Sequence, residues 1–192
     1  MRVQRLADHR HVPWRNGLGT TLEVAVGPLL VADDESSWSW RVSVATVDQD
    51  GPFSSFPNVD RTLVVVEGDG LELQVGSHRF SALPSCPVNF PGDEPTTATL
   101  LNGPVRDLNV MVRRTVATTS VYVTDTTTLT PSSSTGSSCV VFALGDATVG
   151  PYQLVRFAAV VGVEVADGPV PVSGPVVVVE IRPEGSFLVR HT

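Results

Sequence analysis

Apolar and polar residues alternate with a period of two along much of the chain, which is typical of β-strands. The alternation is clear in Thr20–Val26 and in Trp38–Val47, where the residues on one face of each predicted strand are mainly apolar. No amphipathic helix of ordinary length is found, so the sequence predicts an all-β chain. Further strands are expected at Thr62–Glu67, Leu71–Val75, Thr96–Leu101, Val105–Arg113, Val140–Leu144, Tyr152–Val161, Val176–Ile181 and Phe187–Arg190.

Glycines and prolines between these segments indicate how the strands are joined. The Gly-Asp-Gly at 68–70 predicts a tight turn into Leu71–Val75, and the Asn-Gly at 102–103 predicts a hairpin between its two flanking strands. Prolines at 84, 87 and 91 mark an irregular stretch that a central strand could not tolerate. Regular short strands with such turns favour a barrel or a sandwich.

The composition changes after Arg114. Thr124–Ser138 is rich in hydroxyl side chains and nearly uncharged, which predicts a surface loop or linker. We therefore expect a first unit at residues 1–115 and a second β-rich half at residues 116–192 that packs on it.

Composition and charge exclude several classes of protein. The chain has 192 residues, of which 42% are hydrophobic and 17% charged, so it can bury a large core and is not disordered. The net charge is −7 and no basic run occurs, which argues against nucleic-acid binding. No apolar run is long enough to span a membrane. Cys86 and Cys139 stand alone, and with no signal-peptide pattern they indicate a reducing cytoplasm.

Residues that could hold a metal or act as a nucleophile are scattered. The four histidines are His9, His11, His78 and His191, and only His78, at a turn, lies within the strand region of the first half. One imidazole supplies too few ligands for a transition metal, so neither a metal nor another cofactor is expected. No Gly-x-Ser-x-Gly motif is present either.

Two strands carry compact polar faces. Arg41 and Ser43 share the face opposite the tryptophans and lie about 7 Å apart. Taken alone, this strand favours a solvent-exposed polar face, and a polar cavity is the alternative. Asp107 and Asn109 share a face of the later strand with Met111. A structural ion pair between Arg41 and Asp107 would also explain the two charges.

Several short motifs resemble, in combination and in order, the HutD/Ves family of cupin-like proteins. The resemblance covers roughly residues 1–114. The motifs are Pro13-Trp14-Arg15-Asn16-Gly17-x-Gly19-Thr20-Thr21, Trp40-Arg41-x-Ser43-x-Ala45, Asp50-Gly51-Pro52-Phe53-Ser54-x-Phe56-Pro57-x-Val59-Asp60-Arg61-Thr62, Glu67-Gly68, Phe90-Pro91-Gly92-Asp93 and Leu101-x-Gly103-Pro104-Val105-Arg106-Asp107-x-Asn109-x-Met111.

The resemblance implies a cupin-like double-stranded β-helix with two β-barrels in one chain, as in a bicupin. It also implies a cytoplasmic bacterial protein. In the HutD branch such proteins are linked to histidine utilisation as regulatory or ligand-sensing factors, and the Ves branch is associated with stress responses. In a cupin-like barrel, a strand face with Arg41 and Ser43 can point into a pocket.

We therefore expect a regulatory protein that binds a small polar or anionic metabolite, such as a histidine-degradation intermediate. Arg41 would bind a carboxylate of this ligand, and Asp107 and Asn109 would hold an amine, formimino or ring nitrogen. The expected ligand-binding residues are Asn16, Arg41, Ser43, Arg61, Phe90, Asp93, Asp107 and Asn109.

Two other functions stay open at this point. A metal-independent isomerase or lyase would use Asp93 or Asp107 as its acid and base, with a pKa raised by burial. The other open function is that of an interaction protein without a ligand. The expected partner is a carboxylate-bearing small molecule, with no nucleic acid and no membrane, and a homodimer is left open.

Overall fold

The computed structural model describes residues 2–4, 10–13, 20–27, 38–130, 137–155, 160–163 and 168–184. These residues form seventeen strands in three sheets and contain no helix. The prediction of an all-β chain is therefore confirmed. The strands pair antiparallel within each sheet, and a parallel bridge joins Val65 to Pro84 outside the named strands.

The spatial order of the strands in each sheet differs from their order along the chain. The six-stranded sheet runs through β2 (Arg10–Pro13), β3 (Thr20–Val26), β4 (Trp40–Val47), β11 (Val105–Arg113), β6 (Val59–Glu67) and β9 (Val88–Pro91). The four-stranded sheet runs through β5 (Gly51–Pro52), β10 (Thr96–Leu100), β7 (Leu71–Val75) and β8 (His78–Ala82). The seven-stranded sheet runs through β1 (Arg2–Gln4), β16 (Val160–Val163), β13 (Ser138–Ala143), β17 (Val170–Pro183), β14 (Ala147–Val149) and β15 (Tyr152–Val155), with β12 (Ala117–Leu129) also paired to β17.

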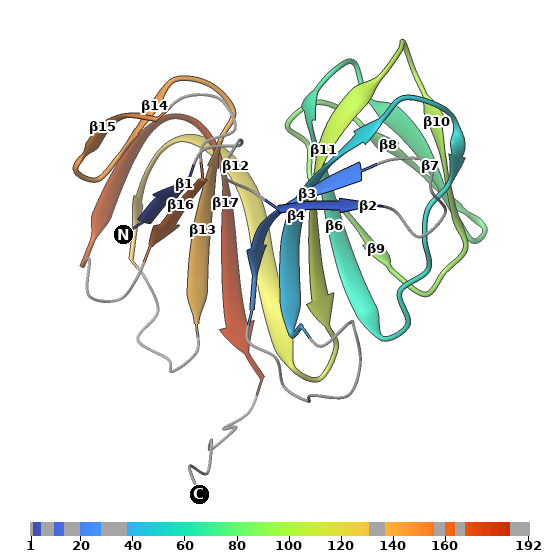
Figure 1. The fold of residues 1–192 in the computed structure, drawn as a ribbon, viewed down its shortest axis with the longest axis horizontal. Coiled ribbons are helices and arrows are strands. Elements are labelled where there is room, and N and C mark those ends of the chain that lie inside the picture. Colours follow the sequence, from blue (N-terminus) through green and yellow to red (C-terminus); the bar gives the residue numbers. More distant parts are fainter. Residues whose placement is uncertain are drawn as a thin grey trace, which may run out of the picture.

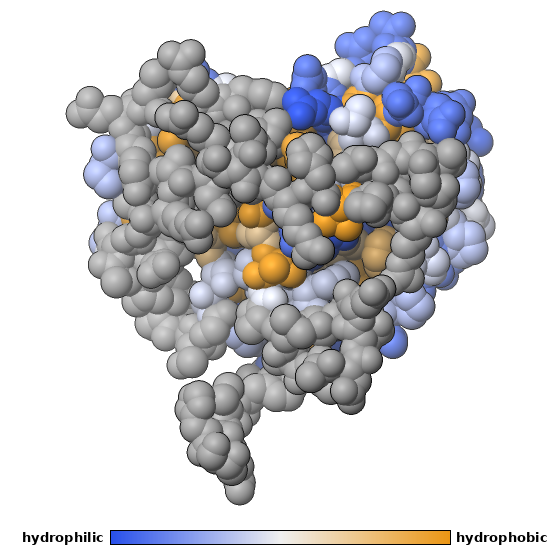
Figure 2. Space-filling view, in the orientation of Figure 1, coloured by the Kyte–Doolittle hydropathy of each residue, from blue (hydrophilic) through white to orange (hydrophobic). Residues whose placement is uncertain are grey.

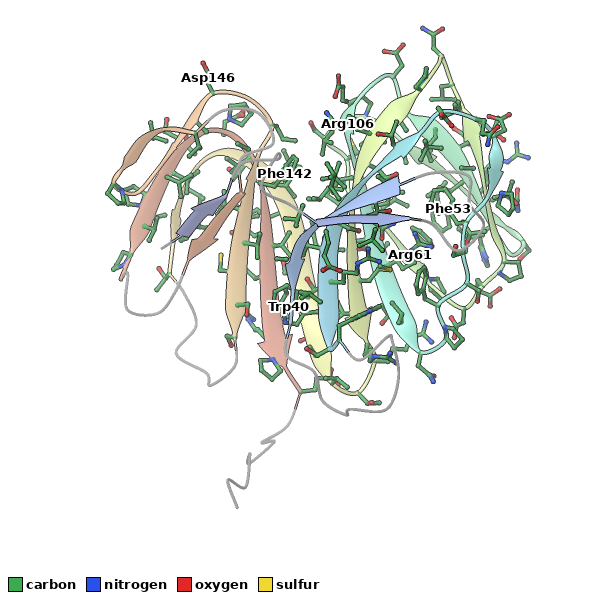
Figure 3. All side chains as sticks on the ribbon, in the orientation of Figure 1. Trp40, Phe53, Arg61, Arg106, Phe142 and Asp146 are labelled. Atoms are coloured by element: carbon green, nitrogen blue, oxygen red, sulfur yellow. The ribbon has the colours of Figure 1, made fainter. Side chains whose placement is uncertain are left out.

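The sheets form two lobes, with the six-stranded sheet as the middle layer (Figure 1). One face of this sheet packs on the seven-stranded sheet, where Val42 and Val110 share a core with Phe142. Figure 3 shows Trp40 and Phe142 at this junction between the lobes. The opposite face packs on the four-stranded sheet, where Leu63 shares a second core with Leu73.

The seven-stranded sheet encloses a third core of its own. This core is built mainly from valines, among them Val141, Val176 and Val178, all of which are fully buried. Figure 2 shows hydrophilic side chains gathered on the upper and right rim of the lobe that contains the four-stranded sheet. Hydrophobic side chains lie in the centre of that view, where the two lobes meet.

The predicted strand pairing across the glycine turns is wrong. β10 pairs with β5 and β7, whereas β11 pairs with β4 and β6, so the Asn-Gly turn does not close a hairpin. The Gly-Asp-Gly turn likewise connects β6 to β7, which belong to different sheets. Gly68 and Gly103 adopt positive φ angles of 96° and 92°, so sharp turns are present. They carry the chain from one layer to the next, which a local turn signal does not reveal.

The predicted linker at Thr124–Ser138 is also wrong over its first residues, because β12 continues to Leu129. Threonine is β-branched and suits an extended strand, and this strand is paired with β17 along its length. Two short strands were not predicted from the sequence: β8, which precedes the proline-rich stretch, and β9, which lies within it. β9 is an edge strand, the position in a sheet where proline is tolerated.

In the second half, the predicted strand at Tyr152–Val161 is divided between β15 and β16, and β17 is longer than predicted. The predicted strand at Phe187–Arg190 lies outside the described residues. β1 belongs by sequence to the first half expected at residues 1–115. It nevertheless pairs with β16, in the sheet of the second half. The N-terminal strand therefore ties the two halves together.

We expect Gly27→Ala to destabilise the protein by about 1–3 kcal/mol or more, because a β-carbon at this position would overlap the Trp40 indole. Trp40 is buried in the core between the sheets and has little room to move. Gly51→Ala is the matched control, since nothing lies within 4 Å of a β-carbon added there. Its unfolding free energy should stay within about 0.5 kcal/mol of the wild type. Urea denaturation of both variants tests this expectation, and equal stabilities would contradict it.

Candidate functional site

Polar side chains gather on the face of the six-stranded sheet that points towards the four-stranded sheet. The register defines three rows across β4, β11 and β6. They are Arg41–Met111–Arg61, Ser43–Asn109–Leu63 and Ala45–Asp107–Val65. Leu63 and Val65 belong to the core shared with the four-stranded sheet, which fixes the direction of this face. We call the polar members Arg41, Ser43, Arg61, Asp107 and Asn109 the interior polar cluster.

The cluster is shielded from water. Ser43 is 2% exposed and the Arg41 side chain 13% exposed, so the solvent-exposed face favoured from the strand alone is wrong. A single strand shows which residues share a face, but it cannot show that another sheet covers that face. Arg41 forms an ion pair with Glu23 of β3, whose side chain is also half-buried, at 3.2 Å.

Arg61 lies at the centre of the aromatic part of this site. Its guanidinium carbon is 5.1 Å from the ring centre of Phe53, 5.6 Å from that of Phe56 and 4.9 Å from that of Phe90. Cation–π attraction to these rings replaces part of the lost hydration. Figure 3 shows Arg61 and Phe53 in the same lobe, beside β6.

The hydrogen bonds that Arg61 makes to the described residues leave much of its guanidinium unused. Nε donates to Oδ1 of Asn109 at 3.4 Å, and one terminal nitrogen donates to the carbonyl oxygen of Ser54 at 3.3 Å. These bonds use two of the five N–H donors of the side chain. Arg61 is 5% exposed, and its burial lowers the pKa to about 10, against the raising effect of Asp107. It is still cationic at neutral pH.

Asp107 is the second ionisable group buried in the cluster. It is 1% exposed, and its Oδ1 has no hydrogen-bond partner among the described residues. Burial raises the pKa of Asp107 to about 7, and the positive charge of Arg61 acts in the opposite direction. The ion pair proposed from the sequence between Asp107 and Arg41 is not found among the described residues, where Arg41 pairs with Glu23 instead.

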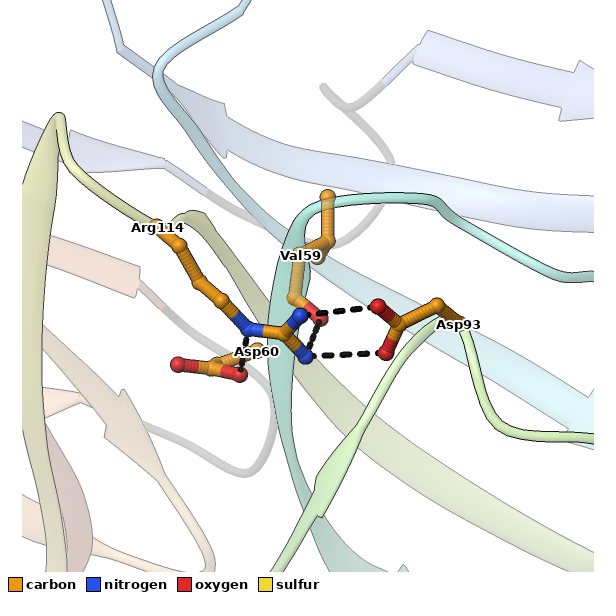
Figure 4. Close-up of polar contacts among 4 residues, drawn as sticks. All are labelled: Val59, Asp60, Asp93 and Arg114. Carbon is orange, nitrogen blue, oxygen red and sulfur yellow. Dashed lines mark hydrogen bonds and ion pairs between the residues drawn. The ribbon is translucent and has the colours of Figure 1, made fainter.

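Asp93 lies outside the interior polar cluster and is exposed. Its carboxylate accepts two hydrogen bonds from Arg114, at 2.8 and 2.9 Å, and Arg114 also donates to Asp60 and to the Val59 carbonyl oxygen (Figure 4). These hydrogen bonds lower the pKa of Asp93. An acid with a raised pKa, as the enzyme hypothesis required, is thus found at Asp107 and not at Asp93.

The structure brings together six of the eight residues expected from the sequence, namely the interior polar cluster and Phe90, which contacts Arg61. Asn16 lies outside the described residues. Sequence analysis missed Glu23, Phe53 and Phe56 as members of the site. Both phenylalanines lie in the motif that ends at Arg61, and two aromatic residues just before a buried arginine are the signal that could have identified them.

A cleft of about 660 Å³ lies on the other side of β6, between the two lobes. Its lining includes the hydroxyl groups of Thr62 and Thr119 and the amide of Asn89. Thr62 donates a hydrogen bond to Asn89 at 2.6 Å, and Arg114 is engaged by two carboxylates. Arg61 and Phe90 also line this cleft, so it borders the interior polar cluster.

No group of three or more His, Cys, Asp or Glu side chains in the described ranges is arranged to hold a metal ion. In that part of the chain, no helix is long and apolar enough to cross a membrane.

The raised pKa of Asp107 predicts how stability depends on pH. The folded value of about 7 lies above the ordinary value of 3.8, so the folded state binds the additional proton between these pH values. The contribution of Asp107 to stability is therefore full below pH 4 and is lost as the pH rises towards 7, by at most about 1.4 kcal/mol per pH unit. Asp107→Asn should flatten this part of the profile. Urea denaturation at pH 5, 6, 7 and 8 measures both slopes, and parallel profiles would contradict the assignment.

Comparison with known proteins places the chain in a family. Residues 6–167 match the family model described as HutD. The chain is 36% identical to protein Ves of Citrobacter koseri over 145 residues, which cover 73% of this chain and 72% of that protein. It is 31% identical over 112 residues to an uncharacterized 21.2 kDa protein in the hutC 3′ region of Pseudomonas putida, covering 58% of this chain and 57% of that relative. This second match thus spans little more than half of the relative's length.

Solved structures agree with the sequence matches. The structure of HutD from Pseudomonas fluorescens SBW25 (formate condition) superposes with a TM-score of 0.81 at 25% identity, covering 96% of this chain and 99% of the other. A cupin 2 conserved barrel domain protein from Leptotrichia buccalis gives a TM-score of 0.56 at 8% identity, covering 90% and 92%, and shows a shared fold alone. The chain is a cupin-like protein and belongs to the HutD family.

Proposed function

We propose that this protein binds a small carboxylate in the interior polar cluster, with Arg61 as the anchor of the ligand. The observation that carries the proposal is the state of the Arg61 guanidinium, which is buried while only two of its N–H donors have acceptors among the described residues. Buried polar groups are nearly always hydrogen-bonded in native proteins. A carboxylate accepts two parallel hydrogen bonds from a guanidinium and would complete this group.

Arg61 supports this role better than Arg41, which the sequence favoured. Arg41 already has an anionic neighbour in Glu23 at 3.2 Å, so a ligand would compete with that carboxylate. Arg61 has no ion pair within the described ranges, and three phenylalanine rings hold its guanidinium in one place. A fixed guanidinium loses little conformational entropy when a ligand binds, which favours affinity.

The biological setting extends this proposal. The resemblance to the HutD family implies a link to histidine utilisation, and one relative is described by its place in a hutC 3′ region. We therefore propose a histidine-degradation intermediate as the ligand and a regulatory role in sensing it. We also propose that each lobe corresponds to one barrel of a bicupin. The apolar third core then explains why a ligand would bind in only one of the two lobes.

A second candidate function is catalysis, and one observation favours it. Asp107 has a pKa of about 7, which suits a group that both donates and accepts a proton near neutral pH. A metal-independent isomerase or lyase could use this carboxyl on a ligand held by Arg61. Proton NMR spectra of urocanate and of formiminoglutamate with the protein, recorded over hours, test this function. Unchanged ligand spectra would exclude catalysis on these two compounds.

Binding is tested by calorimetric titration with formate, urocanate and formiminoglutamate. We expect Arg61→Lys to weaken the binding at least about tenfold, because lysine keeps the charge but lacks the planar fork. Arg106→Ala is the matched control, since this arginine on the same sheet pairs with Glu67 and is outside the cluster. Melting curves of both variants confirm folding.

Arg41→Ala distinguishes the two candidate anchors. A loss of affinity in Arg41→Ala together with normal binding by Arg61→Lys would assign the ligand to Arg41, as the sequence analysis expected. Normal binding by both variants would remove the ligand from the interior polar cluster. No binding of any of the three compounds to the wild type would contradict the proposed carboxylate ligand.

A further inference from the structure

Asp107 is a buried carboxyl group without the partners that such a group normally has. It is 1% exposed, and no hydrogen bond or ion pair to its side chain is found in the described part of the chain. Its neighbours across the sheet are Ala45 on β4 and Val65 on β6, neither of which can donate a hydrogen bond from its side chain. Burial of an ionised carboxylate in such surroundings is unfavourable unless another charge compensates it.

The charged groups around Asp107 can be named strand by strand. Arg61 on β6 shares its face, and its charge acts on the carboxyl. On β4 and β3, Arg41 and Glu23 form an ion pair with each other. The four-stranded sheet turns only uncharged buried residues towards this face on β7 and β10, namely Leu71, Leu73, Val75, Thr96 and Ala98. His78 begins β8 and is exposed. Among the described residues, Arg61 is therefore the charge that compensates an ionised Asp107.

We infer that Asp107 takes up a proton when an anion binds beside Arg61, so that the site binds the anion and a proton together. This inference rests on the proposed function. A carboxylate bound to Arg61 neutralises the cation that favours the ionised form of Asp107. An ionised Asp107 would then leave an uncompensated negative charge in the interior. Protonation of its carboxylate from solvent restores neutrality, and no other bond is made or broken.

The protein's own charges support this coupling. Arg61 already acts to lower the pKa of Asp107, yet burial raises that pKa to about 7. Neutralising Arg61 removes the lowering effect and raises the pKa further. The expected proton uptake at pH 7 is about half a proton per ligand, because the carboxyl is already half protonated, and it approaches about one at pH 8. The sequence analysis expected Asp107 to hold an amine as a carboxylate, which would cause no uptake.

Calorimetric titration with formate tests the inference, because formate does not itself titrate at the pH values used. The binding heat measured in Hepes and in Tris at pH 7 and pH 8 gives the number of protons exchanged, since the two buffers differ in ionisation enthalpy. We expect net uptake at both pH values, and a formate Kd that rises up to about tenfold per pH unit above pH 7. Binding without proton uptake, or with proton release, would overturn the inference and leave the proposed function intact. No formate binding, together with no binding of urocanate or formiminoglutamate, would overturn both.

Two variants identify the group that takes up the proton. Asp107→Asn should bind formate without proton exchange and with a Kd independent of pH. Glu67→Gln is the matched control, since this carboxylate of the same sheet is exposed, pairs with Arg106 outside the cluster and should leave the uptake unchanged. Uptake that persists in Asp107→Asn, or that disappears in Glu67→Gln, would assign the proton to another group. If Asp107→Asn does not fold, the proton counts of the wild type and of Glu67→Gln decide.

Discussion

The burial of both faces of the six-stranded sheet is the constraint on which the rest of this structure depends. β11 shows it most clearly, because Leu108 and Val110 face the seven-stranded sheet while Asp107 and Asn109 face the four-stranded sheet. A strand in an ordinary two-layer protein could turn its polar face to water. In this protein the polar face is covered, so each of its charges must find compensation inside the protein or from a bound molecule.

The compensation is uneven across the face. Arg41 and Glu23 neutralise each other at one side of the sheet. Arg61 has aromatic rings, one amide oxygen and one carbonyl oxygen, which stabilise a cation without neutralising it. Asp107 has the charge of Arg61 nearby and, within the described ranges, no hydrogen bond at Oδ1. Burial of these two charges is costly, and the carboxylate ligand that we propose would reduce the cost.

The sequence predicted individual strands much better than their partners. β3, β7 and β11 have the predicted bounds, since alternation and turn residues are local properties of the chain. Pairing depends on which layer each strand joins, and the turns at 68–70 and 102–103 give no sign that they change sheets. Arg41, Ser43, Asp107 and Asn109 were found for the same local reason, whereas Arg61 was named only through the resemblance to the HutD/Ves family. Their burial was not, because the sheet that covers Arg41 and Ser43 is formed by other parts of the chain.

The position of β17 in the seven-stranded sheet bears on how the protein folds as it is synthesised. β17 pairs with β12, β13 and β14, all of which precede it, so these strands lack their shared neighbour until residues 170–183 have been made. Arg2 likewise has no partner in this sheet until Gly162 has been synthesised. Exposed strand edges are prone to pair with other chains, and contacts between distant residues form slowly. The nascent chain therefore passes through a long interval with unpaired, valine-rich edges, and chaperones that shield such edges would act during this interval.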